Sequence, residues 1–330
     1  MSHDGPFFDD LRLGDVFAGA PSVTLTDGLA AAHHAIVGGR YRLALDAGLS
    51  RRVAGSAGAL ASPAFAWDVS IGQSTLVTQR AIANLFYRGL FFLRAPEIGD
   101  TLLTRTEIVG LRPAAAKADR PARGLAVMRV TTSDGEGRPV LDFFRCALLP
   151  ARLAAREAAS GLLEPQTPAA SPASLAEAAS GWDLAAFRSA LPSGHFAALR
   201  DGQTREVAGD VVTSAPELAR LTLNLAAIHH DSRAGGGTRL VYGGHTIGLA
   251  AAQASRAFPD MVTILGWHGC DHLGPVREND TVRSTIAVER LEPLPSGGGI
   301  AHLRSRVVAE PVSGGSATDV LDWRFVALFA

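Results

Sequence analysis

The pattern of apolar and polar positions predicts two pairs of helices. One helix is expected at residues 27–37 and another at 214–223, where Ser214 and Glu217 fit a capping box. Two further helices, at 63–73 and 243–258, are rich in Ala and Gly. Because their side chains are small throughout, we expect other elements to wrap closely around these two helices.

Runs of β-branched and apolar residues follow each pair of helices. They predict strands at 126–132, 281–289, 302–308 and 320–329. Helices followed by an antiparallel meander indicate an α+β class. A sheet curled around one apolar helix would satisfy this pattern.

An internal repeat divides the chain into two copies of one domain. Val-Leu-Asp at 140–142 recurs at 320–322, and Gln73 corresponds to Gln253 at the same offset of 180 residues. A repeat this long predicts two tandem domains rather than a solenoid. We therefore expect a first half at 1–152, a linker at 153–195 and a second half at 196–330.

The predicted linker is rich in Ala, Pro and Ser between residues 154 and 174. This composition is typical of a flexible connection, although an ordered strap across the surface fits equally well. A short helix is possible at 175–190.

Composition and charge exclude several classes of protein. The 330 residues carry a net charge of −1 and only two cysteines, Cys146 and Cys270. Near-neutrality excludes a bulk electrostatic nucleic-acid binder and a polybasic membrane-surface protein. Two distant cysteines exclude a disulfide framework, and no apolar run approaches roughly 18 residues. The first residues show no basic or apolar region, so we expect no signal peptide. We expect a cytoplasmic protein with reduced thiols.

Chemically active residues are densest in the second half. Asn224, His229 and Asp231 lie in one short segment, and Gly243 and Gly244 open the predicted Ala-rich helix. This arrangement resembles the MaoC-like hydratase family, the (R)-specific enoyl-CoA hydratases, whose motif is Asp-x-Asn-Pro-x-His-x-Asp. The resemblance implies a double hotdog fold, in which each of two domains wraps an antiparallel sheet around a central helix.

The resemblance assigns roles to these residues. The family's catalytic His corresponds to His229 and its final Asp to Asp231, whereas its catalytic Asp corresponds to Asn224. An amide holds a water molecule but does not accept its proton. The sequence of the two halves together most resembles the mesaconyl-CoA hydratases (β-methylmalyl-CoA dehydratases). This resemblance is carried by residues 242–245 in the second half and 83–85 in the first.

The residue types suit hydration of an enoyl thioester. That reaction needs a base for water, a proton donor for the α-carbon and a stabiliser for the thioester oxygen. His229 serves as acid and base, Asn224 positions the water, and the N–H groups of Gly243 and Gly244 form an oxyanion hole at a helix start. Asp231 either orients His229 or has a structural role.

The first half lacks these groups. Aligning Asp46 with Asp231 places Ala44 at the position of His229, and Pro63 takes the place of Gly243. Proline has no N–H to donate. We therefore expect the first half to be catalytically silent and to supply half of the acyl-CoA groove.

Several further residues are candidates for substrate binding. They are Tyr242, His245, His272 and Arg88. A strand at 267–272 would place His268, Cys270 and His272 on one face, as in a metal site, but pocket lining is the favoured interpretation. The resemblance implies no metal and no cofactor.

The combined prediction is a hydro-lyase acting reversibly on a 2-enoyl-CoA, with mesaconyl-CoA as the substrate implied by resemblance. The expected partners are an acyl-CoA and a second copy of the chain, without nucleic acid or membrane. Three alternatives stay open: a hotdog acyl-CoA thioesterase, a (3R)-hydroxyacyl thioester dehydratase and a non-catalytic acyl-CoA-binding protein.

Overall fold

The computed structural model describes residues 5–115, 121–153, 159–165, 177, 179–295 and 297–330. Its α-helices are α1 (Asp27–Val37), α2 (Arg42–Leu45), α3 (Ala47–Ala54), α4 (Pro63–Gln73), α6 (Leu184–Ala190), α7 (Ala215–Leu221) and α8 (Gly243–Ala257). Short 3-10 turns are η1 (Phe8–Asp10), η2 (Ser74–Val77), η3 (Phe196–Ala198) and η4 (Ala227–His229).

The long strands form two antiparallel groups of four. They are β3 (Ala83–Phe92), β4 (Thr101–Pro113), β5 (Arg123–Ser133) and β6 (Pro139–Pro150), then β10 (Met261–His272), β11 (Thr281–Pro293), β12 (Gly299–Glu310) and β13 (Thr318–Phe329). Short strands border them: β1 (Val16–Phe17), β2 (Val23–Thr24), β7 (Ser160–Gly161), β8 (Thr204–Glu206) and β9 (Asp210–Val211).

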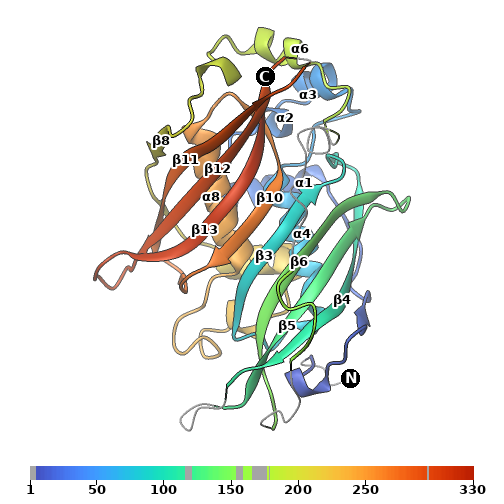
Figure 1. Ribbon diagram of the computed structural model, residues 1–330, viewed down its shortest axis with the longest axis vertical. Helices are drawn as coiled ribbons and strands as arrows, with labels where there is room; N and C mark the ends of the chain where they lie inside the picture. Colours follow the sequence, from blue (N-terminus) through green and yellow to red (C-terminus); the bar gives the residue numbers. More distant parts are fainter. Residues whose placement is uncertain (1–4, 116–120, 154–158, 166–176, 178, 296) are drawn as a thin grey trace.

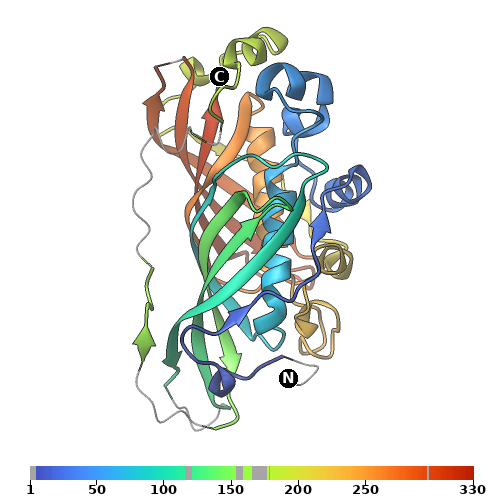
Figure 2. The ribbon, with the colours of Figure 1, turned by 90° about the vertical axis from the view of Figure 1, so that its right-hand side faces the viewer.

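One antiparallel pair, β3 with β10, joins the two groups into a single sheet. The strand order is β1-β4-β5-β6-β3-β10-β13-β12-β11-β8, so each half contributes one side (Figure 1). The helices cover one face of this sheet, with α4 and α8 closest to it (Figure 2). The predicted α+β double hotdog is therefore confirmed.

The two central helices are enclosed as their composition predicted. Every residue of α4 is buried, and α8 is buried along most of its length. Trp67 of α4 packs edge-on against Trp267 of β10, with ring centroids 4.8 Å apart. The second half thus supplies part of the enclosure of the first half's central helix.

Equivalent contacts in the two halves confirm the repeat in three dimensions. The Nε2 group of Gln73 donates to the carbonyl of Leu102 at 2.9 Å, and that of Gln253 donates to the carbonyl of Val282 at the same distance. Each pair is displaced by 180 residues from the other. These glutamines tie each central helix to the strand beside it.

Two local expectations need correction or restriction. The capping box at Ser214 does not form, because Ser214 has a left-handed backbone (φ 59°) and its side chain caps nothing; Glu278 accepts the N–H of Ala215 instead. Much of the predicted linker lies outside the described residues. Of the helix expected at 175–190, α6 covers Leu184–Ala190, and residues 179–181 form a turn before it.

Among the described helices, none combines the length and the apolar character that crossing a bilayer requires.

The β3–β10 pair depends on a close backbone approach at Gly266. Its φ is 148°, and a β-carbon there would lie 2.2 Å from the carbonyl oxygen of Leu90 on β3. At Gly269 on the same strand, a β-carbon would meet nothing nearer than the end of the Arg88 side chain, at 3.5 Å.

Gly266→Ala should therefore lower the free energy of unfolding by about 3 kcal/mol, through backbone strain and overpacking. Gly269→Ala is the matched control and should change it by less than about 1 kcal/mol. Urea unfolding of both variants measures the difference. Equal stability of the two variants would show that the approach of β3 to β10 tolerates a side chain at residue 266.

Candidate active site

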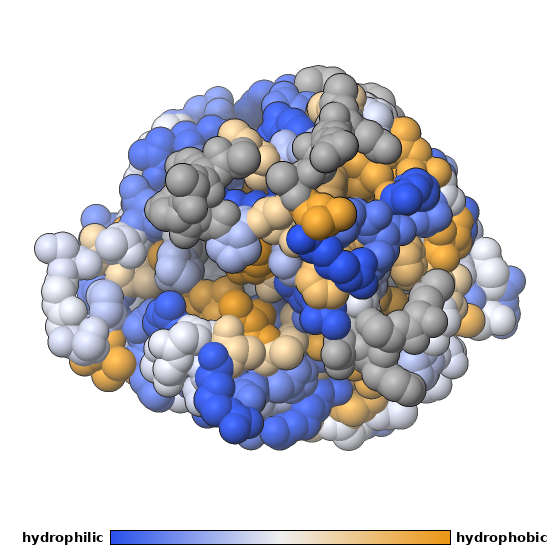
Figure 3. Space-filling model, turned by 90° about the horizontal axis from the view of Figure 1, so that it is seen from below, coloured by the Kyte–Doolittle hydropathy of each residue, from blue (hydrophilic) through white to orange (hydrophobic). Residues whose placement is uncertain are grey.

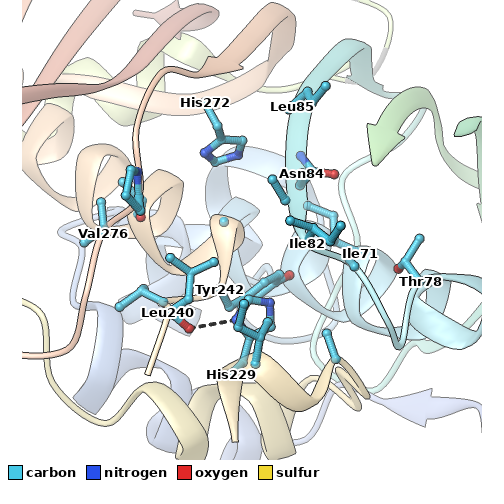
Figure 4. Close-up of a pocket in the computed structure, with 18 of the residues that line it drawn as sticks. Ile71, Thr78, Ile82, Asn84, Leu85, His229, Leu240, Tyr242, His272 and Val276 are labelled. Atoms are coloured by element: carbon cyan, nitrogen blue, oxygen red, sulfur yellow. Dashed lines mark hydrogen bonds between the residues drawn. The ribbon is translucent and has the colours of Figure 1, made fainter. Parts of the chain in front are cut away.

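A cavity of about 300 Å³ lies between the halves, where α8 begins. The first half lines it with residues that include Thr75, Thr78, Asn84, Leu85, Tyr87 and Arg145. The second half lines it with residues that include Asn224, Ile228, His229, Tyr242, Gly243 and His272 (Figure 4). Seen from the lower end of the molecule, apolar residues lie in a recess rimmed by hydrophilic ones (Figure 3).

His229 presents a fixed ring to this cavity. It ends η4, and its Nδ1–H donates to the carbonyl of Leu240 at 2.8 Å (Figure 4). Since a carbonyl only accepts, this bond places the proton on Nδ1 and leaves the lone pair on Nε2. Burial lowers the pKa of His229 to about 4. The ring is therefore neutral near pH 7, and Nε2 is available as a base.

Asn224 is buried beside the histidine, with its amide orientation set by the backbone. Its Oδ1 accepts the N–H of Ala226 at 3.0 Å, so the Nδ2 group is its available donor. The Nε2–H of His230 donates to the backbone carbonyl of Asn224 at 2.6 Å. His230 thus supports the turn rather than facing the cavity.

Helix α8 begins at Gly243 on the cavity wall. The first N–H groups of a helix have no partner within the helix, and the helix dipole adds partial positive charge there. A β-carbon on Gly243 would lie 2.8 Å from Nε2 of His272. That nitrogen is buried without a hydrogen-bond partner among the described residues, and burial lowers the pKa of His272 to about 4.

Tyr242 forms a wall of the cavity and links it to the interior. Its ring packs against His229 with centroids 5.9 Å apart, and its hydroxyl donates to the backbone carbonyl of Asp68 at 3.1 Å. Asp68 in turn accepts from Nε2 of His33 at 2.9 Å. Burial raises the pKa of Asp68, against the opposing influence of His33. This buried network fixes the ring of Tyr242.

Comparisons with known proteins agree with the double-hotdog fold. No protein-family model matches the chain. A conserved hypothetical protein of Mycobacterium tuberculosis with a double hotdog fold is 50% identical over 100% of both chains, with a TM-score of 0.91. A MaoC domain protein of Chloroflexus aurantiacus shares the fold at 22% identity, covering 99% of this chain and 98% of that one, with a TM-score of 0.85.

The chain belongs to the double-hotdog proteins, because the Mycobacterium tuberculosis protein that is 50% identical over both full chains has that fold. Two curated relatives are also similar over most of the chain. The mesaconyl-CoA hydratase of Cereibacter sphaeroides is 28% identical, covering 92% of this chain and 89% of that protein. The β-methylmalyl-CoA dehydratase of Chloroflexus aurantiacus is 26% identical, covering 93% and 89%.

In this double-hotdog chain, the first half repeats the backbone contacts that frame the cavity but carries other side chains there. The N–H of Leu60 donates to the carbonyl of Leu43 as that of Leu240 donates to the carbonyl of Ile228. These paired contacts place Ala44 at the position equivalent to His229, in agreement with the sequence alignment.

The cavity at the equivalent place in the first half is only about 20 Å³. Pro63 stands there instead of Gly243, Phe92 instead of His272, and Ile264 instead of Asn84, while Trp182 forms part of the wall. In the first half, apolar side chains therefore fill the space that corresponds to the cavity of the second half, where the equivalent residues include an imidazole and an amide.

Four predicted site residues lie outside the cavity. Asp231 is exposed and paired with Arg233 at 2.9 Å, so it does not orient His229. Arg88 forms an ion pair with Asp271 at 2.6 Å. Gly244 does not line the cavity either. Asp68 and Tyr242 occupy the space where a side chain at residue 244 would lie.

His245, the fourth, is fully buried within α8, and neither ring nitrogen has a hydrogen-bond partner among the described residues. Burial lowers its pKa to about 3. It is thus a buried neutral residue of the helix rather than a cavity residue.

A register shift in β10 separates His268 from Cys270 and His272, the other two residues considered for a metal site. The shift lies between Trp267 and Gly269, and His268 stacks on His302 whereas His272 faces the cavity. No group of three potential metal ligands exists among the described residues. The expectation of a shared face is therefore wrong, because the extra residue reverses the alternation.

Sequence reasoning overlooked Arg145, a buried arginine on the cavity wall. The internal repeat contained a signal for it. Arg145 occupies the position that the second half gives to Phe325, which is fully buried. A charged residue where the duplicate has a core aromatic is the signal that could have identified it.

The buried histidines should make the stability of the fold depend on pH. The folded-state pKa of His245, about 3, lies below the unfolded value of about 6.5. The unfolded chain therefore binds the proton more readily, and the free energy of unfolding falls as pH drops below about 6.5.

His245→Leu should reduce the loss of stability between pH 7.5 and pH 5 by up to about 2 kcal/mol. The exposed His34 gives a control, His34→Leu, that should leave the loss unchanged. Urea unfolding at both pH values measures it. An unaltered pH dependence in His245→Leu would contradict the assignment of a strongly lowered pKa.

Proposed function

We propose that the protein is a hydro-lyase that adds water reversibly to a 2-enoyl-CoA thioester. One observation carries the proposal: the unprotonated Nε2 of His229 and the first turn of α8 face the same cavity. The named curated relatives are a hydratase and a dehydratase, which supports this reaction class.

His229 performs both proton transfers in the proposed mechanism. Its Nε2 removes a proton from water as the oxygen attacks the β-carbon. The same nitrogen then delivers that proton to the α-carbon. Because one group serves both steps from one side, the addition is syn. The bond to Leu240 holds the ring in the required tautomer throughout.

The start of α8 stabilises the negative charge that develops on the thioester oxygen. The N–H of Gly243 is the donor on the cavity wall, and the helix dipole reinforces it. His272 lies beside this position and contacts the thioester end of the substrate. Glycine at residue 243 leaves room for both groups.

Asn224 positions the attacking water through its Nδ2 group. The family carries aspartate at this place, so a second base is absent here and His229 is the single titrating group for the chemistry. Tyr242 limits the movement of the His229 ring by packing against it.

The acyl group that we propose is mesaconyl, with β-methylmalyl-CoA as the hydrated product. The support is the name of the curated relatives, which match 92% and 93% of this chain. Hydration and dehydration are the two directions of one equilibrium, so both names describe the same chemistry.

His229→Gln should lower kcat for hydration of mesaconyl-CoA by roughly 100- to 10,000-fold, because glutamine neither accepts nor returns a proton. His268 lies outside the cavity, and His268→Gln is the control that should retain wild-type activity. Loss of enoyl-thioester absorbance measures the rate. Substantial activity in His229→Gln would contradict the mechanism.

A thiol-reactive dye in the same assay separates hydration from the alternatives. A hydratase consumes the enoyl absorbance without releasing free CoA. Release of CoA thiol would identify a thioesterase, and binding of the enoyl-CoA without turnover would identify a non-catalytic binding protein. Preference for a long straight acyl chain would instead indicate a (3R)-hydroxyacyl thioester dehydratase.

A further inference from the structure

Arg145 is a buried cation on the cavity wall. It lies on β6 opposite Tyr87 of β3, and it shares one face of that strand with the buried Phe143 and Ala147, each two residues away. Its side chain therefore points toward the interior, and the residue is only 3% exposed. It lines the same cavity as His229.

The hydrogen bonds of Arg145 leave its charge without a counter-ion. Its Nη1 donates to Oγ of Ser74 at 2.6 Å and its Nη2 donates to Oγ1 of Thr78 at 2.9 Å. Its Nε is buried and has no partner, and no carboxylate forms an ion pair with it in the part of the chain that the structure describes. Two neutral hydroxyls orient the guanidinium without neutralising it.

Several other arginines of the same sheet are paired, and Arg112 and Arg306, which form no ion pair among the described residues, are exposed to solvent. Arg88 pairs with Asp271, Arg129 with Asp142, and Arg304 with Asp322. A buried charge is costly unless it is paired, and arginine stays protonated. Among the described residues, Arg145 is the arginine that lines this cavity, and it is buried at 3% exposure without a carboxylate partner. A ligand in the cavity could supply the missing counter-charge.

The position of Arg145 fits the acyl end of the proposed substrate. Its charge contributes to lowering the pKa of both His229 and His272, so it is electrostatically close to both. Its partner Thr78 lies on the side of His229 away from Leu240 and Val276 (Figure 4). Asn84 on the first-half wall adds an amide whose nitrogen and oxygen are both buried without a hydrogen-bond partner among the described residues.

We propose that Arg145 binds a carboxylate of the acyl group and so selects dicarboxylic 2-enoyl-CoA substrates. The planar guanidinium matches a carboxylate, and the bond gains strength in a desolvated site. The phosphates of CoA are poorer candidates, because they belong to the bulky nucleotide end whereas Arg145 is buried within the cavity. The inference rests on the proposed function and adds the residue that determines specificity.

The first test compares two substrates that differ in one group. Mesaconyl-CoA carries a carboxylate where 2-methylcrotonyl-CoA carries a methyl group. The wild type should favour mesaconyl-CoA by at least about 100-fold in kcat/KM, because a site built for a polar group rejects an analogue lacking it. In Arg145→Met this ratio should fall below about 10, mainly through a higher KM for mesaconyl-CoA.

Two further variants separate binding from structural damage. Arg145→Lys keeps a positive charge and should retain an intermediate preference. Arg129→Met removes an arginine from the neighbouring strand β5, where it pairs with Asp142, and should leave the ratio unchanged. Loss of activity on both substrates to the same extent in Arg145→Met, with no recovery in Arg145→Lys, would overturn the specificity role.

A binding experiment gives a readout that does not depend on turnover. Titration calorimetry with the saturated thioesters methylsuccinyl-CoA and 2-methylbutyryl-CoA should show tighter binding of methylsuccinyl-CoA by the wild type. Arg145→Met should lose that difference. Equal affinities in the wild type would overturn the inference even if enoyl-CoA hydration is observed. Discrimination between the two ligands without hydration of any enoyl-CoA would overturn the proposed function alone.

Discussion

The antiparallel pairing of β3 with β10 is the constraint on which the rest of the structure depends. It turns two half-sheets into one surface and places both central helices on the same face. The strands approach so closely at Gly266 that a β-carbon would meet the backbone of β3. The cavity follows from this junction, because the start of β3 and the end of β10 form its walls.

Duplication preserved the scaffold and concentrated polar chemistry in one place. Gln73 and Gln253 make equivalent bonds from the two central helices. Around the helix starts the halves differ: Pro63 faces apolar residues and almost no free volume, whereas Gly243 faces the large cavity. Both copies therefore keep the packing of the scaffold, whereas the side chains around the helix starts differ.

Desolvation shapes the electrostatics of the cavity. Burial keeps the rings of His229 and His272 neutral, and the unpaired guanidinium of Arg145 acts in the same direction. Interactions between charges are stronger in such a medium than in water. An anionic acyl group that pairs with Arg145 would remove part of this effect, so binding of substrate and basicity of His229 are physically coupled.

The sequence by itself determined the α+β class, the duplication and the positions of His229 and Gly243 in short motifs. Those features follow from local composition and from the repeat, and both can be recognised without knowledge of the tertiary contacts. Only the tertiary structure decided which side chains share the cavity. A register shift in β10 turned His268 away, and pairing across the sheet brought Arg145 to a site whose histidine lies far along the chain. Strand register cannot be read directly from the sequence. It nevertheless determines which side chains are buried and which residues they contact.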